Sequence, residues 1–466
     1  MGGMRGIGQT RGVAVVVGVL VALVATLVVP VGGAGATTSR SVRRATAPGY
    51  EQTIDIAVAD IQDYWSGEFP DLYGSRYIPV PANRIIAGRP GVRLPSCQGE
   101  RLSYRDVADN AFYCFHDNFI AYDDSGLFRE LYQSVGPFSV ALVLAHEWGH
   151  AIQDRSGDTG GPTIYAELQS DCFAGAWTAD VSNDPEDVPY SAGDLEVALA
   201  ALLRFRDAPG SSPDDPSAHG SAFDRVSAFQ DGFESGPERC ATYFDDPPSV
   251  VQIPFSSEAE AQSGGDVPAA DVIPLTVDLL NEFYSQVEPK YTPLTVDDVY
   301  AFDSTKPRTI PRCGGTRPEV KIVRNRVYFC IDDEYVAFDE PFLQQIYDEI
   351  GDFGVSTLIA NPWATHVQIQ QGIPGAADNT LAAVLQADCY TGGWAAAFYN
   401  GLLSAGSLSA GDLDEFVQAF LVYSRARGIS SDVPITFVRV RFFRLGFFAG
   451  YQSCGYSAVA AAVAAL

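Results

Sequence analysis

The 466-residue chain repeats itself, and this repeat constrains the fold more than any other feature of the sequence. Two five-residue segments recur a little over 210 residues apart: LQSDC at Leu168 returns as LQADC at Leu385, and SAGDL at Ser191 returns at Ser409. The cysteines recur at a similar offset, as Cys97, Cys114, Cys172 and Cys240 in the first half and as Cys313, Cys330, Cys389 and Cys454 in the second. Agreement among so many separate landmarks predicts a tandem duplication of one unit.

The repeat predicts a first domain over residues 51–250, a linker over 251–272, and a second copy over 273–466. The boundary falls between Asp245 and Pro274, where proline, glycine, serine and acidic residues replace the apolar periodicity. Each unit mixes helical patterns with short strand patterns, which indicates an α+β fold.

Several elements can be located within the first unit. The patterns predict an opening helix over 58–65, a long apolar helix from Pro137 to Gly157, a second helix over 164–179, and a third that Ser191 caps and that ends near Arg206. The segment 119–122 reads as a strand, matched by 335–338.

The N-terminal segment over residues 1–36 is typical of a secretory signal peptide. Arg5 and Arg11 precede an apolar run over 13–29, and small residues follow at 34–36. The run is also long enough to be a single uncleaved membrane anchor, and the flanking charges do not separate these two interpretations. Residues 37–50 form a polar leader. In both cases we expect an extracytoplasmic protein, either secreted or anchored to the membrane.

The cysteine usage agrees with export. The eight cysteines contain no C-x-x-C pair, so four disulfides are the simplest interpretation for an exported chain. Only one simple pairing keeps every bridge within one copy and treats both copies alike, although spacing alone cannot fix connectivity. It joins Cys97 to Cys114, Cys172 to Cys240, Cys313 to Cys330, and Cys389 to Cys454.

The charge balance argues against nucleic acid as a partner. Aspartate and glutamate number 58 against 30 lysines and arginines, which gives a formal net charge of −28. A basic binding surface of useful size is not compatible with that balance.

The long helix of the first unit carries the motif His146-Glu147-Trp148-Gly149-His150. Histidines at i and i+4 lie on one helical face, so both imidazoles can reach a single zinc ion. Glu147 lies beside that face, where it can take a proton from a water on the metal. The motif therefore predicts one zinc ion per chain, with His146 and His150 as ligands and Glu147 as the catalytic base.

A third ligand is expected from the next helix. Glu167 and Asp171 are four residues apart, so they share a helical face. Their placement after His150 resembles the arrangement of glutamate zincins, which implies that Glu167 binds the metal and that Asp171 holds a zinc-bound histidine through its second nitrogen.

The first half resembles the neutral zinc metallopeptidase family of bacteria. The resemblance rests on HEWGHAIQ from His146, ELQSDCFAGAW from Glu167, SAGDL from Ser191, and a His-Gly-Ser segment that begins at His219, and it covers about residues 55–245. It implies a zincin-like domain, a zinc cofactor and peptidase activity.

The second half lacks the chemistry of the first. At the offset of the repeat, His146 falls on Asn361, Glu147 on Pro362, His150 on Thr365, and Glu167 on Val384. We therefore expect a degenerate copy without metal, in which Pro362 disfavours a regular helix. His366 is expected to be a structural residue rather than a ligand.

The same comparison sorts the remaining candidates. Asp171 recurs as Asp388 in the half that lacks the zinc ligands. This favours a hydrogen bond of Asp171 that supports the fold (a scaffold role) over a role limited to orienting a metal ligand (metal tuning). His219 aligns with Val433, so it is assigned to the catalytic group as a possible donor to the oxyanion. A plain loop histidine is an equally open interpretation.

These features favour an exported zinc-dependent endopeptidase with one active and one degenerate domain, acting on peptide or protein substrates. The strand over 119–122 is a candidate edge for binding an extended peptide. Two alternatives stay open: a non-catalytic envelope binding or scaffold protein with a structural zinc, and a zinc amidase acting on cell-wall peptides. The two copies are expected to pack against each other.

Overall fold

The structure is a computed structural model that describes residues 48–115, 117–158, 160–185, 188–404, 406–427 and 434–464. The predicted signal peptide or anchor over 1–36 lies outside these described residues, as do most of the leader and Val433. Within the described part of the chain, no helix has both the length and the apolar character needed to span a bilayer.

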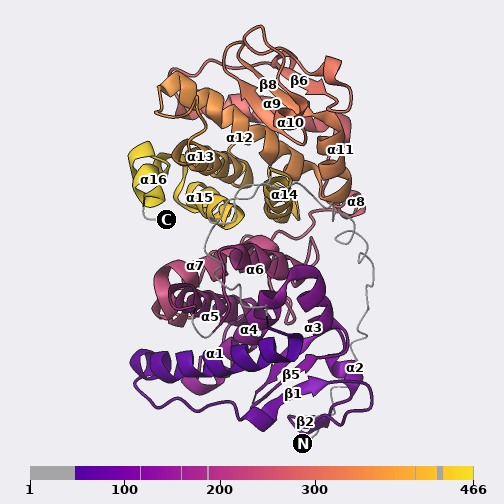
Figure 1. Cartoon of the computed structure of the whole chain (residues 1–466), viewed down its shortest axis with the longest axis vertical. Helices are drawn as coiled ribbons and strands as arrows, with labels where there is room; N and C mark the ends of the chain where they lie inside the picture. Colours follow the sequence, from indigo (N-terminus) through magenta and orange to yellow (C-terminus); the bar gives the residue numbers. More distant parts are fainter. Residues whose placement is uncertain are drawn as a thin grey trace, which may run out of the picture. The chain divides into compact units, whose positions relative to one another are not determined.

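The first half is an α+β assembly of a three-stranded sheet, a two-stranded sheet of β2 and β3, and several long helices (Figure 1). It begins with α1 (Tyr50–Tyr73), which contains the predicted helix over 58–65. Its strands and helices are β1 (Ile85–Gly88), β2 (Ser96–Cys97), β3 (Glu100–Arg101), α2 (Tyr104–Val107), β4 (Ala111–Cys114), β5 (Phe119–Asp123), α3 (Leu127–Glu130), α4 (Pro137–Ser156), α5 (Thr163–Asn183), α6 (Gly193–Arg204) and α7 (Ala222–Ala241). The predicted helices over 137–157 and 164–179 are therefore present.

Most elements of the second half follow the order of the first, although no described strands there correspond to β2 and β3, and α16 has no counterpart among the described helices of the first half. The elements of the second half are α9 (Ala269–Val287), β6 (Val299–Phe302), α10 (Val320–Val323), β7 (Val327–Cys330), β8 (Tyr335–Asp339), α11 (Glu340–Glu349), α12 (Asp352–Gln371), α13 (Leu381–Tyr399), α14 (Asp412–Arg427), α15 (Ile435–Ala449) and α16 (Tyr456–Val463). In each half the sheet has a central strand that pairs in parallel with one neighbour and antiparallel with the other: β1-β5-β4 in the first and β6-β8-β7 in the second.

The sheet order corrects the prediction of an edge strand over 119–122. These residues form β5, which is the central strand and is buried along its whole length. The edge strand beside the motif helix is β4, whose described pairing is with β5 alone. Apolar runs mark buried strands, and burial on both sides belongs to a central position rather than to an edge.

The prediction that Pro362 breaks the helix is also wrong. Helix α12 is continuous from Asp352 to Gln371, with Pro362 in its interior. Proline removes one backbone hydrogen bond, but Ile359, Ala360, Trp363 and Ala364 around it are fully buried. Tertiary packing of this helix outweighs the local cost of the proline.

The predicted linker contains structure of its own. Helix α8 (Glu258–Ser263) lies inside the segment 251–272, and α9 begins at Ala269, so Pro274 lies within a helix. Ser191 precedes α6 by two residues, and its hydroxyl donates to Asp194 at 2.9 Å rather than capping the helix from the N-cap position.

All four disulfides join the predicted pairs: Cys97–Cys114, Cys172–Cys240, Cys313–Cys330 and Cys389–Cys454. The two long-range bridges fasten α5 to α7 and α13 to the segment that follows α15. Close glycine contacts accompany them, because Gly232 of α7 lies against the Cys172 carbonyl and Gly446 of α15 against the Cys389 carbonyl.

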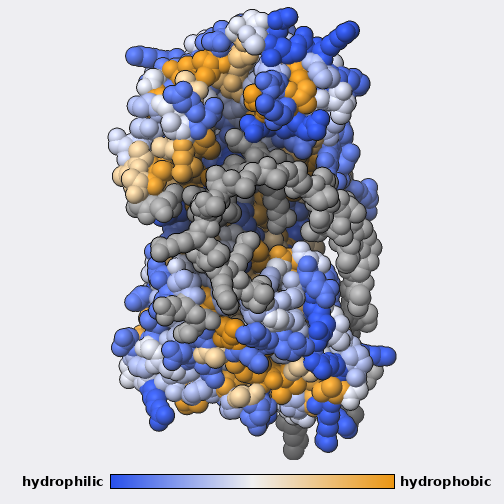
Figure 2. All heavy atoms as spheres, viewed as in Figure 1, coloured by the Kyte–Doolittle hydropathy of each residue, from blue (hydrophilic) through white to orange (hydrophobic). Residues whose placement is uncertain are grey.

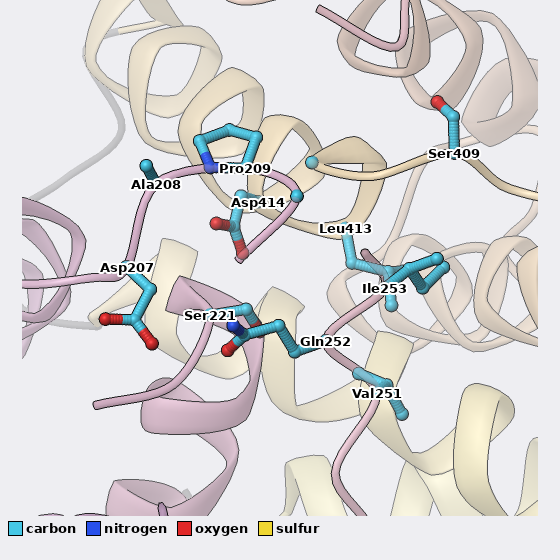
Figure 3. A pocket seen from close by; sticks show the side chains of 12 residues that line it. Asp207, Ala208, Pro209, Ser221, Val251, Gln252, Ile253, Ser409, Leu413 and Asp414 are labelled. Atoms are coloured by element: carbon cyan, nitrogen blue, oxygen red, sulfur yellow. The ribbon is translucent and has the colours of Figure 1, made fainter. Parts of the chain in front are cut away.

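Contacts also join the two halves within the described chain. The backbone N–H of Phe223 donates to Asp414 at 3.0 Å, and Arg444 donates to Asp231 at 2.6 Å. Phe223 is fully buried, and its ring packs on those of Phe416 and Phe443. Figure 3 shows Asp414 of α14 near Asp207 and Ser221 of the first half, around a small cavity that residues of both halves line.

The face of the molecule in Figure 2 is largely hydrophilic, with apolar residues in separate small patches. This distribution fits the excess of acidic residues in the sequence. The apolar residues of the described chain are instead concentrated in one large buried cluster, to which helices of both halves contribute.

The glycine contacts yield a stability prediction. We expect Gly232→Ala and Gly446→Ala each to lower the free energy of unfolding by roughly 1–3 kcal/mol or more, because the added methyl group overlaps a carbonyl of the facing helix. Gly67→Ala in α1 is the control: nothing lies within 4 Å of its added Cβ, so better helix propensity should make it neutral or slightly stabilising. Urea unfolding of the three variants measures the difference, and equal effects would contradict the close packing.

Candidate metal centre

Helices α4 and α5 bring three candidate ligands to one point. The Nε2 atom of His146 lies 3.2 Å from Oε2 of Glu167, and Nε2 of His150 lies 3.5 Å from Oε1 of the same carboxylate. One ligand atom from each residue lies within 4.8 Å of the other two. Two imidazole nitrogens and one carboxylate oxygen at this spacing form a donor set that suits zinc, with room for a further ligand.

The second nitrogen of each histidine is held by a neighbour. Nδ1 of His146 lies 2.8 Å from Oδ1 of Asp171, while Nδ1 of His150 lies 3.0 Å from Oε1 of Gln153 and 3.1 Å from Oγ of Ser170. These contacts fix both rings so that their Nε2 atoms face Glu167. Partners of this kind orient ligating histidines and raise their basicity.

Asp171 has two roles that the sequence comparison treated as alternatives. It lies beside His146, as the resemblance implies, and it also forms a buried bidentate ion pair with Arg225, whose Nε and Nη2 both lie 2.8 Å from its oxygens. The scaffold partner that the sequence comparison left unnamed is this arginine. Arginine suits this position because its two parallel N–H groups match the carboxylate.

The second half keeps this ion pair. Asp388 accepts from Arg439 at 2.7 and 2.8 Å, and from the amide of Asn361 at 2.7 Å. Asn361 stands where the first half has His146, so it preserves the hydrogen bond to the aspartate but offers no imidazole. His366 is buried, and its Nε2 lies 2.9 Å from the carbonyl of Thr292, which is a structural contact.

Glu147 is buried beside the two histidines, and its Oε2 has no hydrogen-bond partner among the described residues. Burial raises the pKa of Glu147, while the nearby His146 and His150 oppose the shift. An unpaired buried carboxylate oxygen is costly, so a group retained in this state points to a ligand or a reacting water as its partner.

The pKa values of the other titratable groups of the site depend on neighbouring charges and hydrogen bonds as well as on burial. Burial alone would lower the pKa of His146, but the Asp171 charge and hydrogen bond outweigh it and raise that pKa. Burial would raise the pKa of Glu167, yet the charge of His150 and hydrogen bonds from both histidines hold it well below the ordinary range. The charge of Arg225 lowers the pKa of Asp171 in the same way.

A cavity of about 430 Å³ opens over these groups. His146, Glu147, His150 and Glu167 line it together with His219, and its apolar walls include Phe112, Leu142, Val143, Leu202 and Phe205. Residues of the edge strand β4 form one side. This is a concave, largely apolar site with a few convergent polar groups, as expected where a small segment of substrate binds.

His219 lies at the cavity wall rather than at the point where the three ligand candidates meet. Just over half of its side chain (53%) is exposed, and its Nδ1 lies 3.4 Å from Oδ1 of Asp207. The other Asp207 oxygen accepts the backbone N–H groups of His219 and Gly220, each at 2.9 Å. Asp207 therefore fixes the loop that carries the histidine.

Comparisons with known proteins agree with this geometry. The protein family described as "Putative neutral zinc metallopeptidase" matches residues 1–243 of the chain. The chain therefore belongs to this family.

Individual relatives match over the first half. The uncharacterized protein Rv2575 of Mycobacterium tuberculosis is 33% identical over 184 residues, which cover 33% of this chain and 62% of that protein. The uncharacterized protein YpfJ of Escherichia coli K12 is 26% identical over 213 residues, or 40% of this chain and 69% of that protein. The chain thus spans about 62% of the length of its mycobacterial relative. No solved structure matches significantly.

Sequence reasoning missed three residues that shape the site. Arg225 lies 214 positions before Arg439, the same offset as Cys240 to Cys454, so the repeat itself could have identified it. Gln153 carried the same kind of signal, since it recurs as Gln368 at the offset that places His146 on Asn361, whereas nothing in the sequence marked Asp207.

The paired aspartates yield a prediction that separates metal tuning from scaffolding. Asp171→Asn should lower zinc affinity by about 10–100-fold, the usual cost of losing the partner of a ligating histidine. Asp388→Asn should leave zinc affinity unchanged, since no ligand candidate of the metal centre contacts it. Both variants should lose stability, by roughly 3–5 kcal/mol if a buried arginine is left uncompensated. Competition with a chromophoric chelator measures the affinities, and an equal loss in both variants would refute the tuning role.

Proposed function

We propose that the protein is an exported zinc-dependent endopeptidase. In this proposal the first half carries the active site that hydrolyses the peptide bonds of the substrate. The observation that carries the proposal is the buried carboxylate of Glu147, whose Oε2 has no partner among the described residues, beside three convergent donor groups on an open cavity. A purely structural zinc needs neither a free base nor an open cavity, so this arrangement favours catalysis.

The donor set fits zinc, with His146, His150 and Glu167 as its ligands. When bound, zinc polarises a carbonyl group and lowers the pKa of a water molecule. Asp171, Gln153 and Ser170 support the ligands by holding the far nitrogens of the two imidazoles.

Glu147 is the proton-transfer group. Its free oxygen can accept the proton of the attacking water and return it to the leaving amine, so that one carboxylate serves as base and then as acid. Burial raises the pKa of Glu147, so its carboxyl group holds the proton at lower cost between these two transfers. His219 is the candidate donor to the oxyanion, because it lines the same cavity and Asp207 orients it.

An extended peptide would bind along β4 rather than β5. Strand β4 is the edge of the sheet and its residues line the cavity, so a peptide could bind beside it by strand addition. The apolar wall of Leu142, Val143, Leu202 and Phe205 is suited to a hydrophobic substrate side chain next to the scissile bond.

Export is supported by the four disulfides, because such bridges persist in oxidising compartments. We further infer that the chain arose by tandem duplication and that its second half is a degenerate copy. Equal sheet order, equivalent disulfides and equivalent buried Asp–Arg pairs support this inference. In this proposal the second half packs on the first and stabilises it without performing hydrolysis.

The first functional prediction concerns zinc and Glu147. We expect one zinc equivalent per chain, lost in a His146→Ala/His150→Ala double variant. Glu147→Gln should retain zinc but lose kcat by about 10²–10⁴-fold, because only the proton-transfer group is removed.

Elemental analysis combined with digestion of casein and of cell-wall peptides measures both effects. The control is Glu130→Gln, an exposed glutamate of α3, which should match the parent in zinc content and rate. Activity on wall peptides alone would identify the amidase alternative. Full activity of Glu147→Gln on all substrates would overturn the mechanism.

The second functional prediction concerns the role of the second half. Truncation after residue 265 should destabilise the first half, because it exposes Phe223 and removes the acceptor of its backbone N–H. Thermal unfolding and the peptidase rate of the truncated chain, compared with the full chain, provide the test. Equal stability and equal rate on every substrate would show that the second half is an inert appendage.

A further inference from the structure

Three carboxylates, one in the linker and two in the second half, form a group that plays no part in the proposed hydrolysis; Asp352 and Glu415 are buried, and Asp266 is half-buried. Asp266 follows α8, Asp352 begins α12, and Glu415 lies in the first turn of α14. One oxygen atom from each residue lies within 4.8 Å of the other two. The charges that act on Glu415 most strongly are those of further carboxylates, Asp412 first and then Asp352 and Asp266.

Backbone hydrogen bonds occupy one oxygen of each carboxylate. Oδ1 of Asp266 accepts the N–H of Asp352 at 3.1 Å, Oδ2 of Asp352 accepts that of Val267 at 2.9 Å, and Oε2 of Glu415 accepts that of Phe353 at 2.8 Å. The three side chains are thus held in place through one oxygen each, while their second oxygens stay outside these bonds.

One of these second oxygens shows that the cluster is incomplete. Only 9% of Asp352 is exposed, and its buried Oδ1 has no hydrogen-bond partner among the described residues. Asp352 and the neighbouring Asp412 also line a cavity of about 100 Å³. A buried carboxylate oxygen without a donor is costly, so its retention requires either a cation or a shared proton.

The first half provides an internal comparison. Gly136 and Gly351 precede α4 and α12 with the same φ of 142°, and a Cβ on either would touch the residue facing it across the helix start. That residue is Val197 in the first half and Glu415 in the second. Pro137 likewise stands where the second half has Asp352. The half without the zinc ligands therefore has two buried carboxylates where the other half has apolar residues.

We propose that Asp266, Asp352 and Glu415 bind a calcium ion in the second half. This site replaces the expectation of a metal-free second half, and it is independent of the zinc centre.

The ligand chemistry favours calcium over zinc and magnesium. The three side chains offer only oxygen, the ligand of hard cations, whereas zinc prefers imidazole and thiolate. Magnesium gives up its waters reluctantly and demands regular octahedral geometry, which a largely buried site with fixed carboxylates does not suit. Calcium accepts irregular oxygen sets, and an exported protein meets it at the concentrations that sites of modest affinity need.

Calcium would connect three segments that are distant in sequence. The ion would join the chain that follows α8 to the starts of α12 and α14, and it would neutralise carboxylates that otherwise repel each other. The expected consequence is a second half whose stability depends on calcium.

The test is calcium titration of the full, zinc-loaded chain, followed by calorimetry and thermal unfolding, with magnesium as a parallel titrant. We expect one calcium equivalent and a rise in Tm, with magnesium much weaker and zinc content constant. Glu415→Gln keeps an oxygen acceptor for the N–H of Phe353 but removes a charge, so its calcium affinity should fall at least tenfold. Glu349→Gln, an exposed glutamate of α11, is the matched control and should bind as the parent does.

A chain of net charge −28 attracts cations over its whole surface. The control variant distinguishes this general attraction from binding at the three carboxylates. Equal calcium effects in the parent and Glu415→Gln, or equal effects of magnesium and calcium, would overturn the proposal. The proposal is also overturned if calcium has no effect on the parent and the Glu415→Gln variant has a higher Tm than the parent. In that case the carboxyl groups share protons instead of binding a cation. Asp352→Asn provides the same readouts if Glu415→Gln does not fold.

Discussion

The buried ion pair between an aspartate of one helix and an arginine of the helix that crosses it is the interaction on which the site depends. Asp171 of α5 and Arg225 of α7 form it in the first half, and Asp388 of α13 and Arg439 of α15 form it in the second. Each pair has almost no exposure, so neither partner can be lost without leaving a charge in the interior. Glycine contacts hold the same helix pairs together, and disulfides join α5 to α7 and α13 to the segment after α15.

This scaffold explains how one fold can carry chemistry in one half and none in the other. In the first half the aspartate that is fixed by Arg225 also holds the ring of His146, so the scaffold and the metal ligand share one carboxylate. Replacing the histidine by Asn361 keeps the hydrogen bond and the packing, and only the donor nitrogen for the metal disappears. The second half thus has this hydrogen bond without the zinc ligands, and its helix α12 is continuous, even with Pro362 in its interior.

The two halves also differ in where they place buried charge. The first half places His146, Glu147, His150 and Glu167 beneath the open cavity, where a peptide and a metal would compensate them. The second half has carboxylates at the starts of α12 and α14, where backbone N–H groups satisfy one oxygen of Asp352 and one of Glu415. Our two proposals, zinc hydrolysis and calcium binding, follow from this contrast.

The sequence by itself determined much of this protein. The repeat predicted the disulfide pairing that the structure shows, the motif predicted His146, Glu147 and His150 as site residues, and the comparison of the two halves showed which of these residues the second half lacks. These signals are local or periodic, so they survive in a linear sequence. Tertiary structure alone decided that β5 is central and β4 is the edge, and that Asp171 contacts both an arginine and a histidine. It also showed that Asp266, Asp352 and Glu415, spread over some 150 residues, meet at one point. Contacts of this kind depend on how helices pack across long separations, and no short pattern of residue types records them.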